Sequence, residues 1–175
     1  MVSAGRLEEI EPEDMRNQVE INLIAPMLLI RAALPTLRRS EAAVIINISS
    51  SIGLVGMPFY TPYAATKGGL ARFGEALRRE LSGERIHVMT VYPGATDTPM
   101  METAEAEDKS GYETPDAVAE ALVAGLEGDE IEVIRGGEDF LALVQSNHDD
   151  PRKADSQVEQ RKAALEKRAA PHRSM

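Results

Sequence analysis

The stretch YTPYAATKGG, residues 60 to 69, holds a tyrosine and a lysine at a spacing that suits proton transfer. Tyr63 and Lys67 are four residues apart, so on a helix they lie on the same face. A phenol ordinarily keeps its proton up to a pH of about 10. A neighbouring ammonium group and the positive end of a helix dipole both stabilise a phenolate, so we expect them to lower the pKa of Tyr63. Near neutral pH, Tyr63 would then exchange a proton with a substrate hydroxyl or carbonyl group.

The same stretch contains a second tyrosine that lacks such a partner. Ala64 stands four residues after Tyr60, so the spacing activates Tyr63 alone. A match to Tyr-x-x-x-Lys is a weak motif by itself, and a pair of side chains facing solvent is the competing interpretation. The neighbouring segments must therefore decide between the two.

Three serines follow a short run of β-branched residues. The run AAVIINI, residues 42 to 48, is too brief for a helix and predicts a buried strand. Parallel α/β sheets bind ligands at the carboxyl ends of their strands, and a serine hydroxyl there can donate to a carbonyl oxygen as charge develops on it. The polar turn YPGATDTPM follows a second predicted strand and would lie at the same edge. Capping of the loop is the alternative role for the serines at 49 to 51.

A proline inside a helical pattern draws attention to Asn22. Pro26 lies four residues further on and has no N–H group to donate to the Asn22 carbonyl. We expect a kink there and a bound water on the free carbonyl oxygen. A kinked surface helix without further function is the alternative.

Strands and helices alternate along the rest of the chain. Strands separated by helices of ten or more residues indicate parallel βαβ units, and hence an α/β fold with about three strands. Residues 1 to 150 read as one domain and residues 151 to 175 as a charged helical tail. Strands are predicted at 42–48, 85–92 and 130–136, and helices at 12–39, 61–81, 114–128, 138–146 and 153–169.

Composition excludes several classes of function. A net charge of -10 argues against nucleic acid as a partner, and the absence of cysteine excludes disulfides and thiolate metal sites. The three histidines, at 87, 148 and 172, are too far apart in sequence for a local metal motif. The longest apolar stretch, INLIAPMLLI, is shorter than the roughly 20 residues that span a bilayer, and no signal peptide opens the chain. We therefore expect a cytoplasmic protein without a metal or a membrane contact.

The tail differs in charge from the body. Residues 151 to 175 carry 7 Lys and Arg against 3 Asp and Glu, whereas residues 1 to 150 carry 12 against 26. Such a segment either docks on the acidic body or a partner, or forms a solvated helix, and its mixed charges favour the solvated helix.

These motifs together resemble the short-chain dehydrogenase/reductase family. The resemblance rests on VEINLIAP, VIINISSSIG, YAATKGG and VYPGATDTPM, in the family's order and spacing, over roughly residues 7 to 136. It implies a partial Rossmann-like, doubly wound parallel sheet and an oxidoreductase that interconverts an alcohol and a carbonyl by hydride transfer with NAD or NADP. It also implies a small-molecule substrate and a homodimer or homotetramer formed through the helices at 12–39 and 61–81.

The resemblance assigns four catalytic residues. Tyr63 would be the acid/base, and Lys67 would bind the hydroxyls of the nicotinamide ribose and lower the tyrosine pKa. Ser50 matches the serine that orients the carbonyl, ahead of its neighbours Ser49 and Ser51. Asn22 matches the asparagine whose main-chain carbonyl holds a water of the proton relay.

The resemblance also assigns the cofactor contacts. Residues 99 to 113 would form a loop over the substrate. The residues that would contact the nicotinamide end of the cofactor are Tyr63, Lys67, Pro93, Gly94, Ala95 and Thr98.

The chain departs from the family at its start. Members of the family open with a strand and a T-G-x-x-x-G-x-G turn and carry an N-N-A-G segment, but only twenty-one residues precede Asn22 and none of these motifs is present. The sequence thus resembles a C-terminal half, lacks the residues that select NAD or NADP, and would leave strand 42–48 as an exposed apolar edge. We expect this chain to bind NAD or NADP weakly or not at all, and to be a poor enzyme alone. The alternative function is a non-catalytic remnant that dimerises and has lost cofactor binding; a serine hydrolase is disfavoured because no G-x-S-x-G motif occurs.

Overall fold

The fold is built on a parallel sheet of three strands. The computed structural model describes residues 1–104, 111–170 and 172–174, so the predicted substrate loop at 99–113 lies partly outside the described residues. The strands are β2 (Ala43–Ile48), β3 (Ile86–Tyr92) and β4 (Glu132–Ile134), in the order β2-β3-β4. The α/β class and the thin parallel sheet expected from the sequence are confirmed.

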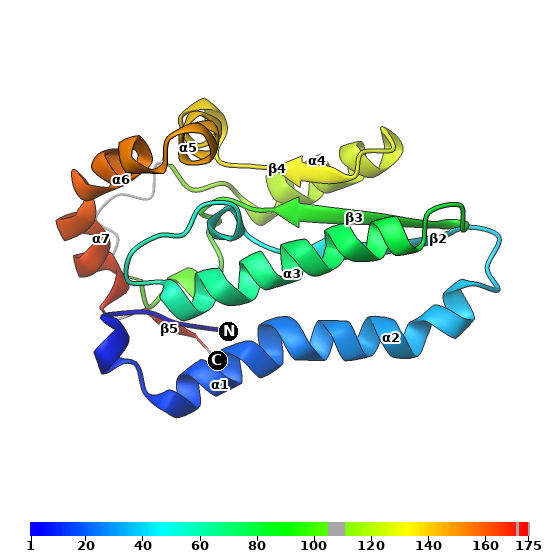
Figure 1. The fold of residues 1–175 in the computed structure, drawn as a ribbon, viewed down its shortest axis with the longest axis horizontal. Helices are drawn as coiled ribbons and strands as arrows, with labels where there is room; N and C mark the ends of the chain where they lie inside the picture. Colours follow the sequence, from blue (N-terminus) through cyan, green and yellow to red (C-terminus); the bar gives the residue numbers. More distant parts are fainter. Residues whose placement is uncertain (105–110, 171, 175) are drawn as a thin grey trace.

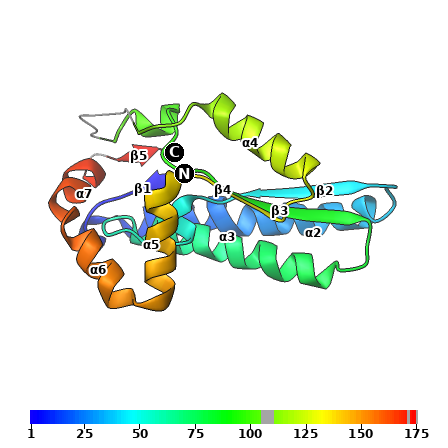
Figure 2. The same cartoon turned by 90° about the horizontal axis from the view of Figure 1, so that it is seen from above.

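Helices cover the two faces of this sheet unequally. Helices α2 (Ala25–Leu37) and α3 (Thr61–Glu80) lie on one face and α4 (Pro115–Glu127) lies on the other (Figures 1 and 2). The larger core cluster lies under α2 and α3. It consists of Ala43, Ile45, Leu77, Leu81, Ile86 and Val88, with Ile30, Leu34, Leu37 and Phe73 packed against them.

Strand β2 is well covered on one face and only partly covered on the other. Its residues alternate between buried Ala43 and Ile45 and exposed Val44 and Ile48. Helix α4 packs against Met89, Val91 and Val133 of the other two strands; Ile46 of β2 is partly buried at the margin of this cluster, while Val44 and Ile48 stay exposed. The sequence predicted that this strand would be buried, and also that it would form an exposed apolar edge of the sheet. In the structure, β2 is an edge strand.

The N-terminal helices form one long continuous helix that is polar at its start and apolar further on. Helix α1 (Pro12–Val19) runs through a π-helical segment (Glu20–Ile24) into α2, so Pro26 is accommodated by a wider helical turn rather than by an end of the helix. The continuous helix Pro12–Leu37 has 26 residues, an 18-residue window with a mean hydropathy of 1.4, and only 6% of that window buried. By length and composition alone this helix could cross a membrane, so the expectation that no apolar stretch is long enough is wrong.

The C-terminal segment docks on the body of the protein. It comprises α5 (Gly137–Asp149), α6 (Pro151–Glu159) and α7 (Lys162–Ala169), so the single helix predicted at 153–169 is divided in two. Its last residues form β5 (Arg173–Ser174), which pairs antiparallel with β1 (Val2–Ser3) and brings the two ends of the chain together (Figure 1). Residues 151–170 are nonetheless mostly exposed, so the tail is helical and solvated over most of its length, as favoured by the charge pattern, while its end docks on the body. Short helical turns lie at Leu7–Glu9, Ser51–Gly53 and Pro99–Met101.

Candidate active site

A cavity of about 710 Å³ opens beyond the carboxyl ends of β2 and β3. Three of the four residues predicted to be catalytic, Ser50, Tyr63 and Lys67, line it. All the predicted nicotinamide contacts of the turn after β3 line it as well: Pro93, Gly94, Ala95 and Thr98. The structure thus brings together side chains from the loop after β2, the start of α3 and the loop after β3.

Backbone hydrogen bonds hold the two loops side by side. The N–H of Ser49 donates to the carbonyl of Val91 over 2.8 Å, and the N–H of Ser51 donates to the carbonyl of Pro93 over 2.8 Å. The parallel pairing of β2 with β3 therefore continues past the ends of both strands, which fixes the serine loop against the turn after β3.

The three serines have different surroundings. The Ser49 hydroxyl is buried and donates to the backbone carbonyl of Lys67 over 2.8 Å, so it fastens the loop to α3. The Ser50 hydroxyl lies close enough to Tyr63 to influence its pKa, and it accepts a hydrogen bond of 3.4 Å from the N–H of Ile52. Ser50 therefore combines a position beside Tyr63 with the capping role that the sequence left open.

Gly53 allows the serine loop to approach α3 closely. A Cβ atom at this position would lie 2.8 Å from the Ser49 hydroxyl oxygen and 2.9 Å from the backbone carbonyl atoms of Lys67. Real Cβ atoms do not approach backbone this closely, so only glycine fits here. The contact sets the spacing between Ser50 on the loop and Tyr63 on the helix.

Burial dominates the titration of Tyr63. Desolvation raises the pKa of the phenol above its ordinary value of 10.0, and the Ser50 hydroxyl opposes this rise without reversing it. The Lys67 ammonium nitrogen lies 5.8 Å from the centre of the tyrosine ring and does not hydrogen-bond the phenol oxygen. The expectation of a lowered Tyr63 pKa is therefore wrong for the protein alone, because burial raises this pKa and Lys67 is not among the groups that shift it.

Lys67 is attached to the end of β2. Its ammonium group donates to the carbonyl oxygen of Ile48 over 3.0 Å, and burial lowers its pKa to about 8. An ammonium group has three donors, and within the described part of the chain this one uses a single donor. Lys67 therefore retains donors for a ligand that bears hydroxyl groups.

Asn22 lies behind the cavity and does not line it. Its side-chain amide donates to the backbone carbonyl of Met1 over 2.8 Å and to the Thr66 hydroxyl over 3.3 Å. Thr66 in turn donates to the backbone carbonyl of Tyr63 over 2.8 Å. Asn22 thus supports the first turn of α3 through Thr66, and its role in a proton relay stays a prediction.

The C-terminal tail supplies residues that the sequence reasoning missed. His172 is buried, its Nε2 lies 3.0 Å from the carbonyl oxygen of Met100, and its Nδ1 lies 3.1 Å from the Tyr60 hydroxyl. A carbonyl only accepts, so Nε2 carries the proton and Nδ1 accepts from Tyr60. Burial raises the pKa of Tyr60 to about 12, which keeps this tyrosine protonated. Tyr60 and His172 are 112 residues apart, and no local pattern connects them.

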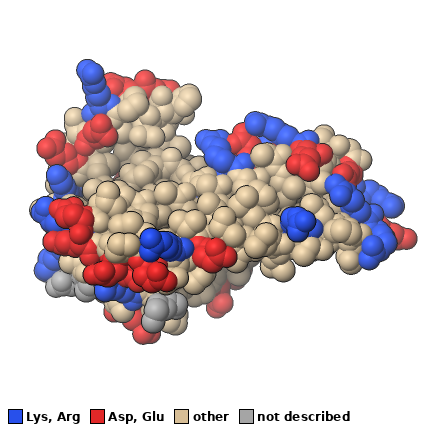
Figure 3. Space-filling model, turned by 60° about the horizontal axis from the view of Figure 1, so that its bottom comes forward, with Lys and Arg blue, Asp and Glu red and all other residues tan. Residues whose placement is uncertain are grey.

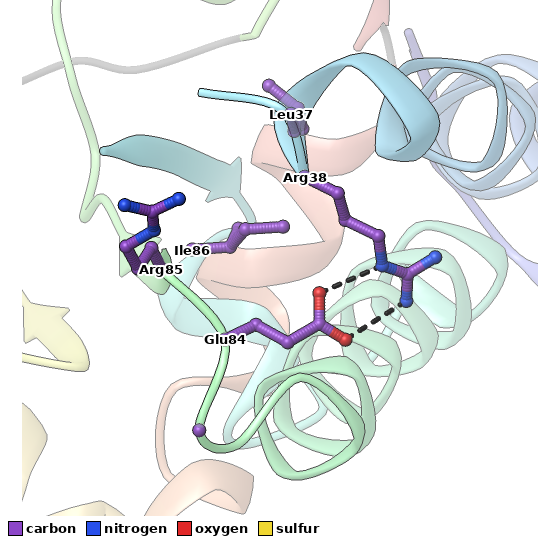
Figure 4. Close-up of a pocket in the computed structure, with 6 residues that line it drawn as sticks. Leu37, Arg38, Glu84, Arg85 and Ile86 are labelled. Atoms are coloured by element: carbon purple, nitrogen blue, oxygen red, sulfur yellow. Dashed lines mark hydrogen bonds and ion pairs between the residues drawn. The ribbon is translucent and has the colours of Figure 1, made fainter. Parts of the chain in front are cut away.

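A second cavity, of about 450 Å³, lies at the opposite end of the sheet. Its wall contains the end of α2 and the start of β3, where the Arg38 guanidinium donates two hydrogen bonds, of 2.8 and 3.1 Å, to the Glu84 carboxylate (Figure 4). This ion pair joins two of the three charged side chains of that cavity wall, the third being Arg85. None of the predicted site residues lies there.

Comparisons with known proteins agree with this arrangement. The short chain dehydrogenase family matches residues 1–109. The chain is 36% identical over 103 residues to a human 3-oxoacyl-[acyl-carrier-protein] reductase, a match that covers 59% of this chain and 44% of the relative. It is 30% identical over 129 residues to a 3-dehydrosphinganine reductase from Danio rerio, covering 69% of this chain and 39% of the relative.

Solved structures give the same result. A short chain dehydrogenase from Burkholderia cenocepacia J2315, solved in complex with NADP, superposes with a TM-score of 0.76 and 28% identity, covering 90% of this chain and 67% of that one. The chain spans less than half the length of the two curated relatives above. Since the family match covers more than half of its residues, the chain belongs to the short chain dehydrogenase family.

Proposed function

We propose that this chain carries the catalytic part of an oxidoreductase that interconverts an alcohol and a carbonyl with NAD or NADP. The observation that carries the proposal is that Ser50, Tyr63 and Lys67 line one cavity, with the Ser50 hydroxyl close enough to Tyr63 to influence its pKa. Two hydroxyl donors side by side suit a carbonyl oxygen that gains negative charge. The names of the relatives, two of them reductases of 3-oxo compounds, support the same reaction class.

Tyr63 and Ser50 have different roles in the proposed reaction. Tyr63 keeps its proton because of burial, so its hydroxyl is ready to donate to a carbonyl oxygen during reduction. Ser50 donates to the same oxygen and steadies it. A bound nicotinamide would supply or accept the hydride.

The residues present fit the nicotinamide-ribose end of such a cofactor. Lys67 offers unused ammonium donors to ribose hydroxyls, and the turn at 93 to 98 presents backbone to the cavity. In that turn, the Thr96 hydroxyl donates a hydrogen bond of 3.1 Å to the backbone carbonyl of Gly94.

We further propose that the long N-terminal helix and α3 form an interface with a second copy of the chain. Leu28 and Leu29 on α2 are 53% and 72% exposed, and Ile21 in the π-helical segment is exposed as well. Figure 3 shows the side of the molecule that carries these helices, with only scattered charged side chains across its middle. An apolar face of this kind favours burial against another protein surface.

The second candidate function is a non-catalytic module that dimerises through this face. The exposed apolar residues of α2 and of β2 favour it, since they serve association whether or not a cofactor binds.

One titration separates the two candidates. NADH and NADPH are titrated by calorimetry into the wild-type chain and into Lys67→Met, and NADPH oxidation is followed with a panel of neutral ketones and aldehydes. Saturable binding that Lys67→Met weakens, with turnover of at least one carbonyl, supports the oxidoreductase. Dimer formation without cofactor binding at millimolar concentration supports the interaction module.

A further inference from the structure

An arginine from the tail reaches the wall of the catalytic cavity. Arg168 lies near the end of α7 and lines the cavity together with Leu165 and His172 of the same segment. Among the described lining residues, Lys67 and Arg168 are the two side chains that carry a fixed positive charge. The sequence reasoning treated residues 151 to 175 only as a charged tail, so no role has been given to this arginine.

The guanidinium of Arg168 lacks an acidic partner among the described residues. Its central carbon lies 5.2 Å from the centre of the Tyr112 ring, a distance at which the cation stacks on the aromatic face. Its Nε is buried and has no hydrogen-bond partner in the described part of the chain. Buried donors are nearly always paired, so an unpaired one in a cavity wall indicates an acceptor that a ligand supplies.

The surroundings favour an anionic acceptor. Arg168 lies close enough to Tyr60 and His172 to influence the charge of both, and it disfavours protonation of the imidazole. Burial first, and Arg168 in addition, lower the pKa of His172 and favour its neutral form, so the guanidinium is the charged group of this part of the wall. Planar guanidinium groups bind carboxylates through two parallel hydrogen bonds.

Most of the remaining wall in this region is apolar. Side chains of Val118, Phe140 and Leu165 line the same cavity, together with Met100. A ligand that satisfies both features has an apolar body and one anionic oxygen group.

We propose that Arg168 is a specificity-determining residue that binds the carboxylate of an oxo acid, or of the corresponding hydroxy acid, whose carbonyl carbon lies at Ser50 and Tyr63. The proposal rests on the proposed function, because it uses the same two hydroxyls for the reacting oxygen. The anion-binding chemistry would equally suit a phosphate of the cofactor. The substrate is favoured because the neighbours of Arg168 are Tyr60, Tyr112 and His172 rather than the turn after β3.

Binding rather than turnover provides the test. Straight-chain oxo acids of increasing length and their methyl esters are titrated into the full chain by ligand-observed NMR, with inorganic pyrophosphate as a separate probe. We expect an acid to bind at least about tenfold more tightly than its ester, as a charge-assisted hydrogen bond provides. Arg168→Met should abolish this preference. Arg168→Lys should retain part of it, since lysine keeps the positive charge but lacks the two parallel donors of the planar guanidinium.

Arg161→Met is the matched control, because it removes an exposed arginine beside the same helix but outside the cavity. It should leave the preference for the acid unchanged. Equal binding of acid and ester by the wild type, a comparison that needs no variant, would overturn the proposal. A preference that survives in folded Arg168→Met, or an arginine effect confined to pyrophosphate, would also overturn it.

The two proposals fail separately. Turnover of neutral ketones without preference for the acid would remove the role of Arg168 and leave the oxidoreductase standing. Arg168-dependent binding of the acid, without any turnover or cofactor binding, would support the role of Arg168 in binding and contradict the oxidoreductase.

Discussion

The Nζ atom of Lys67 lies 5.8 Å from the centre of the Tyr63 ring and donates to the carbonyl of Ile48, not to the phenol. The lysine is thus near the tyrosine but fastened to the end of β2. Since burial raises the pKa of Tyr63, the phenol holds its proton at neutral pH. A protonated phenol suits donation to a carbonyl, which is the proton transfer that the proposed reduction requires.

Replacement of Tyr63 by phenylalanine should stop the reaction and leave the fold intact. The ring keeps its packing and only the hydroxyl is lost, so we expect a loss of about 100-fold or more in kcat, the usual contribution of a positioned acid. NADPH oxidation and circular dichroism measure the two effects. Tyr92→Phe is the control, because its hydroxyl bonds Glu132 over 2.9 Å and does not line the cavity. Retention of full activity by Tyr63→Phe would remove the assignment.

Cofactor binding should weaken at alkaline pH. The pKa of Lys67 is about 8, so its ammonium is charged below that value and becomes neutral as the pH rises through it. A neutral amine donates more weakly to ribose hydroxyls, so the affinity for NADPH should fall across this range. Calorimetric titrations well below and well above the pKa measure the change. Lys67→Met should bind more weakly and lose this dependence; a wild type with constant affinity would contradict the assigned contact.

A single methyl group at Gly53 should disturb the site. Its Cβ would lie 2.9 Å from the Lys67 backbone, so the serine loop must move away from α3. We expect Gly53→Ala to cost about 1–3 kcal/mol of unfolding free energy, as overpacking does, and to reduce activity. Gly56→Ala is the matched control, since a Cβ there meets no atom within 4 Å. Chemical denaturation of both variants measures the difference in unfolding free energy. Equal stability would contradict the prediction, because the serine loop could then move away from α3 at no cost.

The contacts of the C-terminal tail through His172 should contribute less to stability at acidic pH. Burial lowers the pKa of His172 below its ordinary value of 6.5, so the folded state favours the neutral ring. Its contribution to stability is therefore complete above the unfolded pKa and is lost as the pH falls through the folded pKa. We expect His172→Ala to cost about 1–2 kcal/mol at neutral pH and less in acid, because the protonated ring no longer accepts from Tyr60.

Denaturation of wild type and His172→Ala at neutral and acidic pH measures this difference. His148→Ala in α5 serves as the control, because no hydrogen bond of its side chain is found among the described residues and the residue is exposed. A cost of His172→Ala that does not change with pH would assign the histidine a purely packing role.

A charge on the exposed helix face should prevent association. Leu29 is 72% exposed on α2, and a glutamate there would place an unpaired charge in the proposed interface. Sedimentation velocity should show wild type as a dimer or tetramer and Leu29→Glu as a monomer. Leu141→Glu on α5 changes an exposed leucine elsewhere and should not alter the assembly. A monomeric wild type would contradict the interface.

Local pattern determined much of the architecture. The strands at 42–48 and 85–92 and the helix at 61–81 form within a residue or two of their predicted bounds, because side-chain periodicity and short β-branched runs act over a few residues. Helical spacing likewise placed Tyr63 and Lys67 on one face, and the carboxyl ends of parallel strands placed Ser50 near them.

Tertiary structure decided what these residues are able to do. Ser49 bonds the α3 backbone while its neighbour Ser50 meets Tyr63, a distinction that depends on how closely Gly53 lets the loop approach. The pKa of Tyr63 rises because of burial by residues from several elements, and desolvation is a property of the assembled cavity. Arg168 and His172 enter the wall from a tail far along the chain, and contacts between distant segments leave no periodic trace in either of them.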